Sequence, residues 1–265
     1  MIELQNLTKR FGELTAVNDV TLTVNRGEFF AVLGPNAAGK TTTIKMITGL
    51  IKPTSGNVRV AGHDVQAEPL EVRRRLAYVP DFPFLYEKLT PWEFFRFIGQ
   101  LFQMADDRIE TAARALIPRF NLEPYLRKPV EGLSHGTRQR VAIAAALLHE
   151  PEVFVIDEPM VGLDPHHARV VKDILKERSR TGMTVFLSTH QLSVAEEMAD
   201  RIGIIDRGFR SGEIGPQVRE VEIVKRQQHG IITDPYTIAM SASRSEEHTS
   251  ELQSQSTISY AVFCL

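Results

Sequence analysis

The sequence has almost no cysteine: its 265 residues contain one, Cys264. A single thiol forms no internal disulfide and has no partner cysteines for a metal cluster. The chain is therefore not a disulfide-stapled domain, and the scarcity of cysteine favours a reducing compartment.

Long hydrophobic runs are also missing. No run approaches the roughly 20 apolar residues that cross a bilayer, and residues 1–4 lack the basic-then-apolar pattern of a signal peptide. We therefore expect a cytoplasmic protein. The formal net charge of −2 has no excess of one sign that would indicate a nucleic-acid partner.

What the sequence does contain, 43% hydrophobic and 24% charged residues, is typical of a globular chain with one large domain or two modest ones. Residues 2–4 and 20–24 alternate between apolar and polar, which predicts half-exposed antiparallel strands. Residues 29–33 form a continuous apolar run, which predicts a buried parallel strand. A helix over 41–50 and a strand over 57–61 are expected next.

The middle of the chain, about residues 73–150, changes towards helices. Thr90 and Glu93 predict a capping box at a helix start. Asp106 opens another expected helix, which Pro118 ends or kinks. A mostly parallel sheet interrupted by a helical segment is the architecture that this order predicts.

A glycine-rich loop follows the apolar run at 29–33. It matches the phosphate-loop pattern Gly-x-x-x-x-Gly-Lys-Ser/Thr between an expected strand and an expected helix. We expect its amides to hold the phosphates of a nucleotide, with Lys40 at the β- and γ-phosphates, Thr41 on Mg²⁺ and Thr42 at the α-phosphate. The alternative is a chance glycine turn. The expected ATP-binding residues here are Gly34, Pro35, Asn36, Ala37, Ala38, Gly39, Lys40, Thr41 and Thr42.

Another expected strand, residues 153–156, ends in two carboxylates, Asp157 and Glu158. Unpaired acids in a dry core are costly, so we expect Asp157 to bind Mg²⁺ and Glu158 to act as general base on the attacking water. The alternative is a solvated strand end. His190 follows a further strand at 184–187 and is expected to be catalytic, at the γ-phosphate; without the other motifs a lone histidine would be structural.

Taken in order, these motifs resemble the ATP-binding cassette (ABC) ATPase family over about residues 1–208. The resemblance implies an α/β fold: a P-loop NTPase core with a mostly parallel sheet, an N-terminal antiparallel β subdomain, and an inserted helical subdomain at about 84–147. It leaves residues 209–243 without a family counterpart and of uncertain origin.

Residues 244–265 resemble a translated sequencing-library adapter, with residues 255–257 as its index. We expect that this tail is such an artefact and that it is disordered. We also expect the natural reading frame to end at or before Ser243, with an end just after Gly208 as the earlier alternative. The alternative is a natural polar tail, which the serine, glutamate and glutamine content also allows.

Three further sites come from the resemblance alone. The signature-like stretch 133–140 implies that Ser134, His135 and Gly136 start a helix whose positive end faces the γ-phosphate bound by the opposite subunit; a plain capped helix is the alternative. Phe11 is implied to stack on adenine, or else belongs to a core. Asp164 is implied to lie on the loop that links the two sites of a dimer, or else forms an Asp-Pro turn.

Three positions depart from the usual pattern of the family. His135 stands where glycine is common, and we expect this to be tolerated. Asp81 stands where a glutamine usually contacts Mg²⁺; a carboxylate still holds a metal-bound water but donates no hydrogen bond. Ala37 replaces a loop glycine, at a cost only if its φ is positive.

Aromatic residues gather after Asp81, at Phe82, Phe84 and Tyr86. In the family, a groove in this region receives a short helix of the membrane subunit. Two alternatives therefore remain for these three side chains: contact with a partner, or packing in the core of the helical segment. Phe95 and Leu101 are interpreted as core residues of the helical segment.

The resemblance implies an ATP-binding and ATP-hydrolysing subunit of an ABC transporter, with ATP and Mg²⁺ as cofactors. We expect a homodimer or pseudo-dimer, peripheral on the inner face of the cell membrane through a separate integral membrane permease subunit, in the manner of type-2 exporters. No nucleic-acid partner is expected. One alternative is a non-transport ABC ATPase acting on ribosomes or DNA, and another is a module that binds nucleotide without hydrolysing it.

Overall fold

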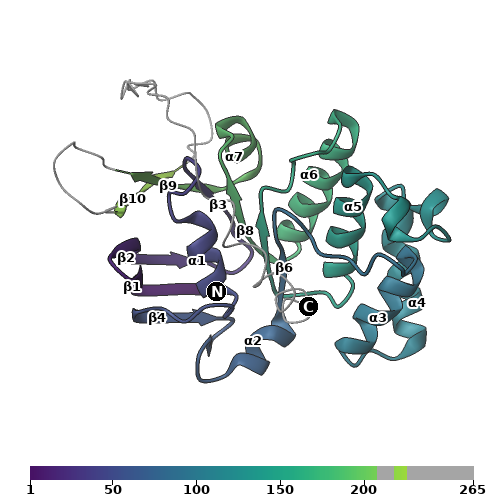
Figure 1. The fold of residues 1–265 in the computed structure, drawn as a ribbon, viewed down its shortest axis with the longest axis horizontal. Helices are drawn as coiled ribbons and strands as arrows, with labels where there is room; N and C mark the ends of the chain where they lie inside the picture. Colours follow the sequence, from purple (N-terminus) through teal and green to yellow (C-terminus); the bar gives the residue numbers. More distant parts are fainter. Residues whose placement is uncertain (208–217, 226–265) are drawn as a thin grey trace.

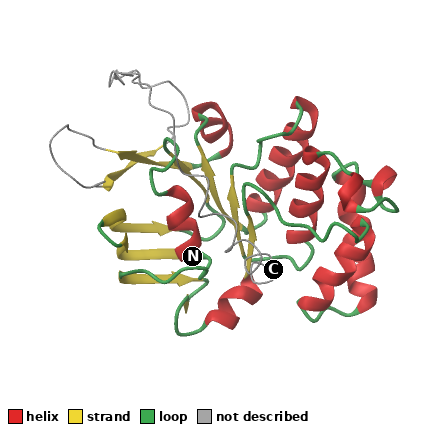
Figure 2. Cartoon of the chain, viewed as in Figure 1, coloured by secondary structure: helices red, strands yellow, loops and turns green. Residues whose placement is uncertain are grey.

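The structure is a computed structural model that describes residues 1–207 and 218–225 (Figure 1). An antiparallel sheet and a mostly parallel sheet stand beside a group of helices (Figure 2). Most of the segment 209–243 and all of the adapter-like tail at 244–265 lie outside the described residues. Within the described ranges, no helix has both the length and the apolar character that spanning a membrane requires.

The first sheet is antiparallel and is built from the beginning of the chain. In the order β2-β1-β4-β5, it comprises β1 (Ile2–Phe11), β2 (Leu14–Val24), β4 (Ser55–Val60) and β5 (His63–Asp64). Ile2 pairs with both Val24 and Val60, and all three side chains are buried. The sheet agrees with the antiparallel strands expected at the start of the sequence.

Strands β1 and β2 are longer than the parts whose alternation is visible in the sequence. The register shifts between Leu4 and Leu7, and Asn6 and Asp19 have positive φ angles of 47° and 52°. The Asn6 side-chain amide donates to Asp19 Oδ1 between the two strands, at 2.9 Å. Such bulges break the two-residue period, so the remaining parts of these strands carry no clean alternation.

The second sheet is mostly parallel and runs through the centre of the described chain. In spatial order its strands are β10 (Val218–Lys225), β9 (Arg201–Arg207), β3 (Phe29–Leu33), β8 (Thr184–Thr189), β7 (Val153–Asp157) and β6 (Leu76–Val79). Every pairing from β9 to β6 is parallel, whereas β10 pairs antiparallel with β9. The carboxyl ends of the parallel strands therefore open on one edge, where ligands bind in open α/β sheets.

Helices cover both faces of this sheet. They are α1 (Lys40–Ile47), α2 (Pro69–Arg75), α3 (Pro91–Leu101), α4 (Asp106–Arg119), α5 (His135–Ala146), α6 (Pro165–Arg180) and α7 (Leu192–Met198). Alternate residues of β3 enter different cores: Phe30 and Val32 pack in the core that contains α1 and the antiparallel sheet, and Phe29 and Ala31 pack in the core that contains α3 to α7. Helices α1 and α5 consequently lie on opposite sides of the sheet (Figure 1).

Local signals decide where the helices begin and end. Helix α3 starts with the expected capping box: Thr90 Oγ1 accepts from the Glu93 amide, and the Thr90 amide donates to the Glu93 carboxylate. Helix α4 ends one residue after Pro118. Helix α1 stops at Ile47, earlier than expected, because Gly49 adopts a φ of 73° that a right-handed helix does not allow.

Candidate functional site

The loop from Gly34 to Gly39 joins β3 to α1 at the carboxyl edge of the parallel sheet. Two of its glycines are required by space: a Cβ on Gly34 would lie 2.5 Å from Ile205 O, and one on Gly39 would lie 2.5 Å from Ala16 O. Glycine lets the backbone approach its neighbours this closely, and the same freedom brings amides close to a bound anion. The other expected residues of this stretch occupy the loop and the first turn of α1: Pro35, Asn36, Ala37, Ala38 and Thr42.

Ala37 has a φ of 61°, in the left-handed region. A residue with a Cβ pays roughly 1–2 kcal/mol in that region, whereas glycine does not. A conformational cost at Ala37 was expected only if its φ is positive. The observed φ meets this condition, so the loop carries that cost.

Lys40 is the first residue of α1 and is only 5% exposed. Its Nζ donates to Gly34 O at 2.6 Å and to Pro35 O at 3.0 Å. A buried ammonium needs such partners. The two carbonyls hold the positive charge of Lys40 against the loop.

Asp157, the last residue of β7, lies against the start of α1. Thr41 Oγ1 donates to Asp157 Oδ2 at 2.9 Å, and Ser188 Oγ donates to Asp157 Oδ1. The carboxylate is 3% exposed. The fold thus joins two expected metal ligands, Thr41 and Asp157, that are far apart in the sequence.

Glu158 and His190 also meet. Glu158 Oε1 lies 2.9 Å from His190 Nδ1, and Thr189 Oγ1 donates to Glu158 Oε2 at 3.3 Å. The Glu158 backbone has a φ of 46°, and its amide donates to Ser188 O at 3.0 Å. A positive φ at a non-glycine residue is uncommon and clusters at functional sites. This turn directs the carboxylate of Glu158 towards the end of β8.

Asp81 follows β6 and completes a group of acids at the carboxyl edge. Burial raises the pKa of Asp81, and the negative charges of Asp157 and Glu158 raise it further. Positive charge on His135 or His190 acts in the opposite direction. Asp81 Oδ1 is buried without a hydrogen-bond partner among the described residues. The site therefore concentrates negative charge and leaves one carboxylate oxygen unsatisfied.

Two polar residues of the site were missed by reasoning from the sequence. Ser188 binds the Asp157 carboxylate, and Thr189 binds the Glu158 carboxylate. Their signal was the polar run that follows the apolar part of β8 directly before His190. Because the carboxyl ends of parallel strands meet at one edge, such a run next to a strand that ends in acids predicts contact.

The signature-like residues begin α5 on the other face of the sheet. Ser134 is the N-cap, and its Oγ accepts from the Thr137 amide at 3.3 Å. His135 and Gly136 form the first turn. Helices α5 and α1 pack into different cores, and the first residue of α5, His135, is near enough to Asp81 for its positive charge to act on that carboxyl.

Asp164 caps the start of α6. Its Oδ1 accepts from the amides of His166 and His167 at 3.1 Å each, and its Oδ2 lies 2.5 Å from His167 Nδ1. The His167 side chain is the main cause that lowers the pKa of Asp164 to about 2. The exposed carboxylate thus has the local role of a helix cap.

Phe11 and the aromatic segment after Asp81 lie at the surface. Phe11 ends β1 and is 49% exposed, with Lys9 Nζ 5.0 Å from its ring centre, so it is not a core residue. Phe82 is 75% exposed, and Phe84 is half exposed. Tyr86 is partly buried and makes edge-on ring contacts with Phe84 and Phe97, at 5.9 and 5.0 Å.

The two core expectations for the helical segment have opposite outcomes. Phe95 is fully buried, as expected. Leu101 is 42% exposed, so its interpretation as a core residue is wrong. It is the last residue of α3, and its side chain is not part of the core that the helix helps to form.

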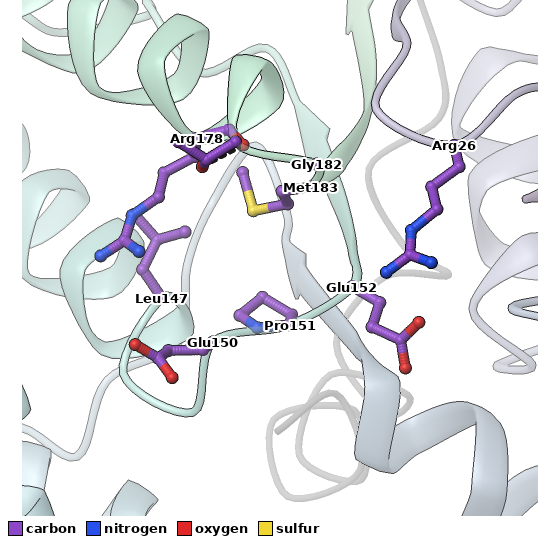
Figure 3. Close-up of a pocket in the computed structure, with 9 residues that line it drawn as sticks. Arg26, Leu147, Glu150, Pro151, Glu152, Arg178, Gly182 and Met183 are labelled. Carbon is purple, nitrogen blue, oxygen red and sulfur yellow. Dashed lines mark hydrogen bonds between the residues drawn. The ribbon is translucent and has the colours of Figure 1, made fainter.

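A cavity of about 190 Å³ lies elsewhere in the molecule (Figure 3). It is lined by Arg26, Leu147, Glu150, Pro151, Glu152, Arg178, Thr181, Gly182 and Met183. Several of these residues directly precede β7 and β8, so the cavity is at the amino ends of the strands. None of the expected site residues lines it.

Comparison with known proteins gives consistent matches. The family described as ABC transporter matches residues 17–161. The linearmycin resistance ATP-binding protein LnrL of Bacillus subtilis (strain 168) is 36% identical over 208 residues, 78% of this chain and 67% of that protein. The daunorubicin resistance ATP-binding protein DrrA3 of Streptomyces coeruleorubidus is 38% identical over 207 residues, 78% of this chain and 66% of that protein. The chain spans about two thirds of the length of these relatives.

A solved structure shares the fold. The dimeric structure of a post-hydrolysis state of the ATP-binding cassette MJ0796, bound to ADP and Pi, has a TM-score of 0.75 and 28% sequence identity, and the match covers 86% of this chain and all of that one. The expected fold class is confirmed by this match. The names of the relatives give no support to an ATPase that acts on ribosomes or DNA.

Proposed function

We propose that this chain, which belongs to the ABC transporter family and is an ATP-binding and ATP-hydrolysing member of it, dimerises around ATP to drive a separate membrane-spanning partner. The observation that carries the proposal is the convergence of Thr41, Asp157, Glu158 and His190 at one edge of the sheet. A phosphate loop, a metal-binding pair and a general base are what ATP hydrolysis needs at one place.

Binding of ATP is assigned to the loop and to Phe11. Lys40, held by two loop carbonyls, is next to the position where the β- and γ-phosphates would lie, and the loop amides would hold phosphate oxygens. Thr42 is assigned to the α-phosphate. The exposed ring of Phe11 offers a flat surface for adenine.

The residues present fit Mg²⁺. This ion keeps several waters and uses one or two protein carboxylates together with substrate phosphates. The described residues hold no preformed cluster of three or more acid, histidine or cysteine ligands, whereas the Thr41 hydroxyl, the Asp157 carboxylate and the unsatisfied Asp81 oxygen are hard oxygen donors near one another. When bound, Mg²⁺ would neutralise charge on the phosphates.

Hydrolysis is assigned to Glu158 with His190. Glu158 accepts the proton of a water as that water's oxygen attacks the γ-phosphorus and the bond to the ADP oxygen breaks. The contacts of Glu158 with His190 and Thr189 fix the orientation of the carboxylate. His190 is 47% exposed on its side chain, so it is accessible to the γ-phosphate as well.

The signature residues require a second chain. Ser134, His135 and Gly136 start α5 on the face of the sheet opposite to α1, and a helix start attracts an anion. We assign them to the γ-phosphate bound by the opposite subunit, and the loop of Asp164 to the link between the two sites. ATP then holds the dimer together, and hydrolysis releases it.

The membrane partner is assigned to the exposed aromatic segment at Phe82 and Phe84. Large exposed apolar side chains mark interaction surfaces, and two lie close together here. Two relatives are named for resistance to linearmycin and to daunorubicin, which supports an export partner and a position on the inner face of the membrane. Co-purification of an integral membrane protein from native membranes tests this part, and a chain found wholly in the soluble fraction counts against it.

The central test is ATP hydrolysis by the chain and by Glu158→Gln. Loss of the general base should lower steady-state phosphate release by roughly 10²–10⁴-fold, and Glu123→Gln, at an exposed glutamate of the helical segment, is the matched control. Equal rates for Glu158→Gln and the control would refute the assignment of Glu158. A chain with no phosphate release at all would favour the non-hydrolysing alternative.

Dimerisation is tested separately, by size-exclusion chromatography with light scattering in the Glu158→Gln background. Adding Ser134→Arg should leave ATP binding intact and abolish the ATP-dependent dimer, because the arginine occupies the space of the opposite subunit's phosphate. Thr111→Arg, which adds the same side chain on the exposed face of α4, should dimerise normally. A Ser134→Arg chain that still dimerises shows that the signature assignment is wrong.

A further inference from the structure

Three segments of the chain meet at the side chain of His135, the first residue of α5. Gly162, in the loop after β7, has no space for a side chain because a Cβ there would overlap the His135 ring. A Cβ on Gly136 would lie 2.7 Å from Gly162 O. The first turn of α5 is therefore packed backbone to backbone against the Gly162 loop, with the imidazole beside it.

The third segment is the exposed aromatic stretch after β6. The rings of Phe82 and His135 have centres 6.0 Å apart and planes inclined by 50°, a separation within the range of favourable aromatic pairs. Phe82 is 75% exposed, so no core holds it in place. Phe84, two residues on, has a different ring partner, Tyr86.

We infer that His135 is a positioning residue that links the exposed Phe82 ring to the phosphate-facing first turn of α5, an inference that rests on the dimeric ATPase proposed above. A partner that covers Phe82 then acts on the imidazole, and the imidazole acts on Ser134 and Gly136, its direct neighbours in the chain. With glycine at this position, neither contact would exist. The His135 side chain, which stands in place of the usual glycine, thus links the partner surface to the shared site. This role replaces the expectation that His135 is a tolerated variation.

A tryptophan reporter tests the link by fluorescence. The chain contains one tryptophan, Trp92, so the background is Trp92→Phe with Glu158→Gln to retain ATP. Phe82→Trp then reports on the His135 contact, and Phe84→Trp is the matched control on the same exposed segment. Each reporter is measured with His135 and with His135→Gly, before and after MgATP.

Addition of MgATP should change the emission of the Phe82→Trp reporter. The size of this change should fall by at least about half when His135→Gly is also present. The signal of the Phe84→Trp reporter should not depend on His135. An equal response of the Phe82→Trp reporter with and without His135 overturns the inference, and so does an equal loss at both reporters.

Light scattering on the same samples separates the two levels of the argument. If no dimer forms with ATP, the proposed function itself fails and the link fails with it. If the dimer forms and the response of the Phe82→Trp reporter does not depend on His135, only the inferred link between Phe82 and the first turn of α5 is wrong.

Kinetics provide an independent measurement. Phe82→Ala and His135→Gly should each lower kcat by about two- to tenfold, the range of one aromatic pair, and should change KM for ATP less than they change kcat. The double variant should lose no more than the larger single loss. Losses that multiply in the double variant, or that appear in KM alone, overturn the inference.

Discussion

Between pH 7 and pH 5, acid should destabilise this chain through the buried imidazole of His149. The residue follows α5 and stacks on Phe102, with ring centres 3.6 Å apart and planes within 11°. Both ring nitrogens are buried, and within the described part of the chain neither has a hydrogen-bond partner of acceptable geometry. Burial lowers the pKa of His149 from 6.5 to about 4, and a nearby backbone group of Leu76 opposes this shift only in part.

The sign follows from which state binds the proton. The fold accepts only the neutral imidazole, so the unfolded chain takes up a proton at a higher pH than the folded chain does. The contribution of His149 to stability is therefore complete above pH 6.5 and is lost as the pH falls towards 4. Linkage with these two pKa values gives a loss of about 2 kcal/mol between pH 7 and pH 5, and about 3 kcal/mol in the acid limit.

Urea unfolding at pH 7 and pH 5 measures this loss. The comparison is between the parent and His149→Phe, which keeps a ring to stack on Phe102 but binds no proton. The parent should lose about 2 kcal/mol more than this variant on acidification. His166→Phe, at an exposed histidine, should behave as the parent does. Equal losses for the parent and His149→Phe would refute the reasoning that the fold buries a neutral imidazole.

Three further outcomes are expected. Ala37→Gly should raise the free energy of unfolding in urea by about 1 kcal/mol, because it relieves a left-handed φ; a lower stability would contradict this. Phe11→Ala should raise KM for ATP roughly fivefold or more with kcat nearly unchanged, since base stacking is worth about 1–3 kcal/mol; an unchanged KM in phosphate-release assays would exclude adenine stacking. Asp81→Asn should stabilise the metal-free chain in EDTA at pH 8, because the raised pKa of Asp81 shows that its ionised form is disfavoured; the gain should disappear as acid protonates the carboxyl in the parent, and a gain that is independent of pH would refute that cause.

Much of the fold was predictable because its signals are local. The apolar run of β3, the glycine loop and the capping box at Thr90 each specify a conformation within a few residues, and all three are present. The bulges at Asn6 and Asp19 were not predictable, because their pairing partners are set by tertiary contacts. The exposure of Leu101 was missed for a related reason: helical period alone does not tell where a helix leaves its core.

The residues of the site could likewise be predicted only where their signals are local in the sequence. Phosphate-loop residues follow a sequence pattern, so their positions beside β3 could be foreseen. The bond from Ser188 to Asp157 depends on β7 and β8 being neighbours, which the sequence does not state. The contacts of His135 with Gly162 and Phe82 join three segments through space. From the sequence, His135 was expected at the phosphate-facing start of a helix and was a departure from the family pattern, but neither contact was foreseen.

The acids at the carboxyl edge also connect ligand binding to stability. In the metal-free chain the charges of Asp157 and Glu158 raise the pKa of Asp81, so the site holds carboxylates that repel one another. A divalent cation relieves this repulsion only in the folded chain. MgATP at a hundred times its Kd should therefore stabilise the protein by about 2.7 kcal/mol relative to the unliganded chain, and the same concentration of ATP in EDTA should stabilise it less. Thermal unfolding in the Glu158→Gln background, which retains ATP and keeps the repulsion between Asp81 and Asp157, measures the difference, and adding Asp157→Asn should reduce it. Equal stabilisation by ATP with and without Mg²⁺ would mean that the acids do not form a metal site.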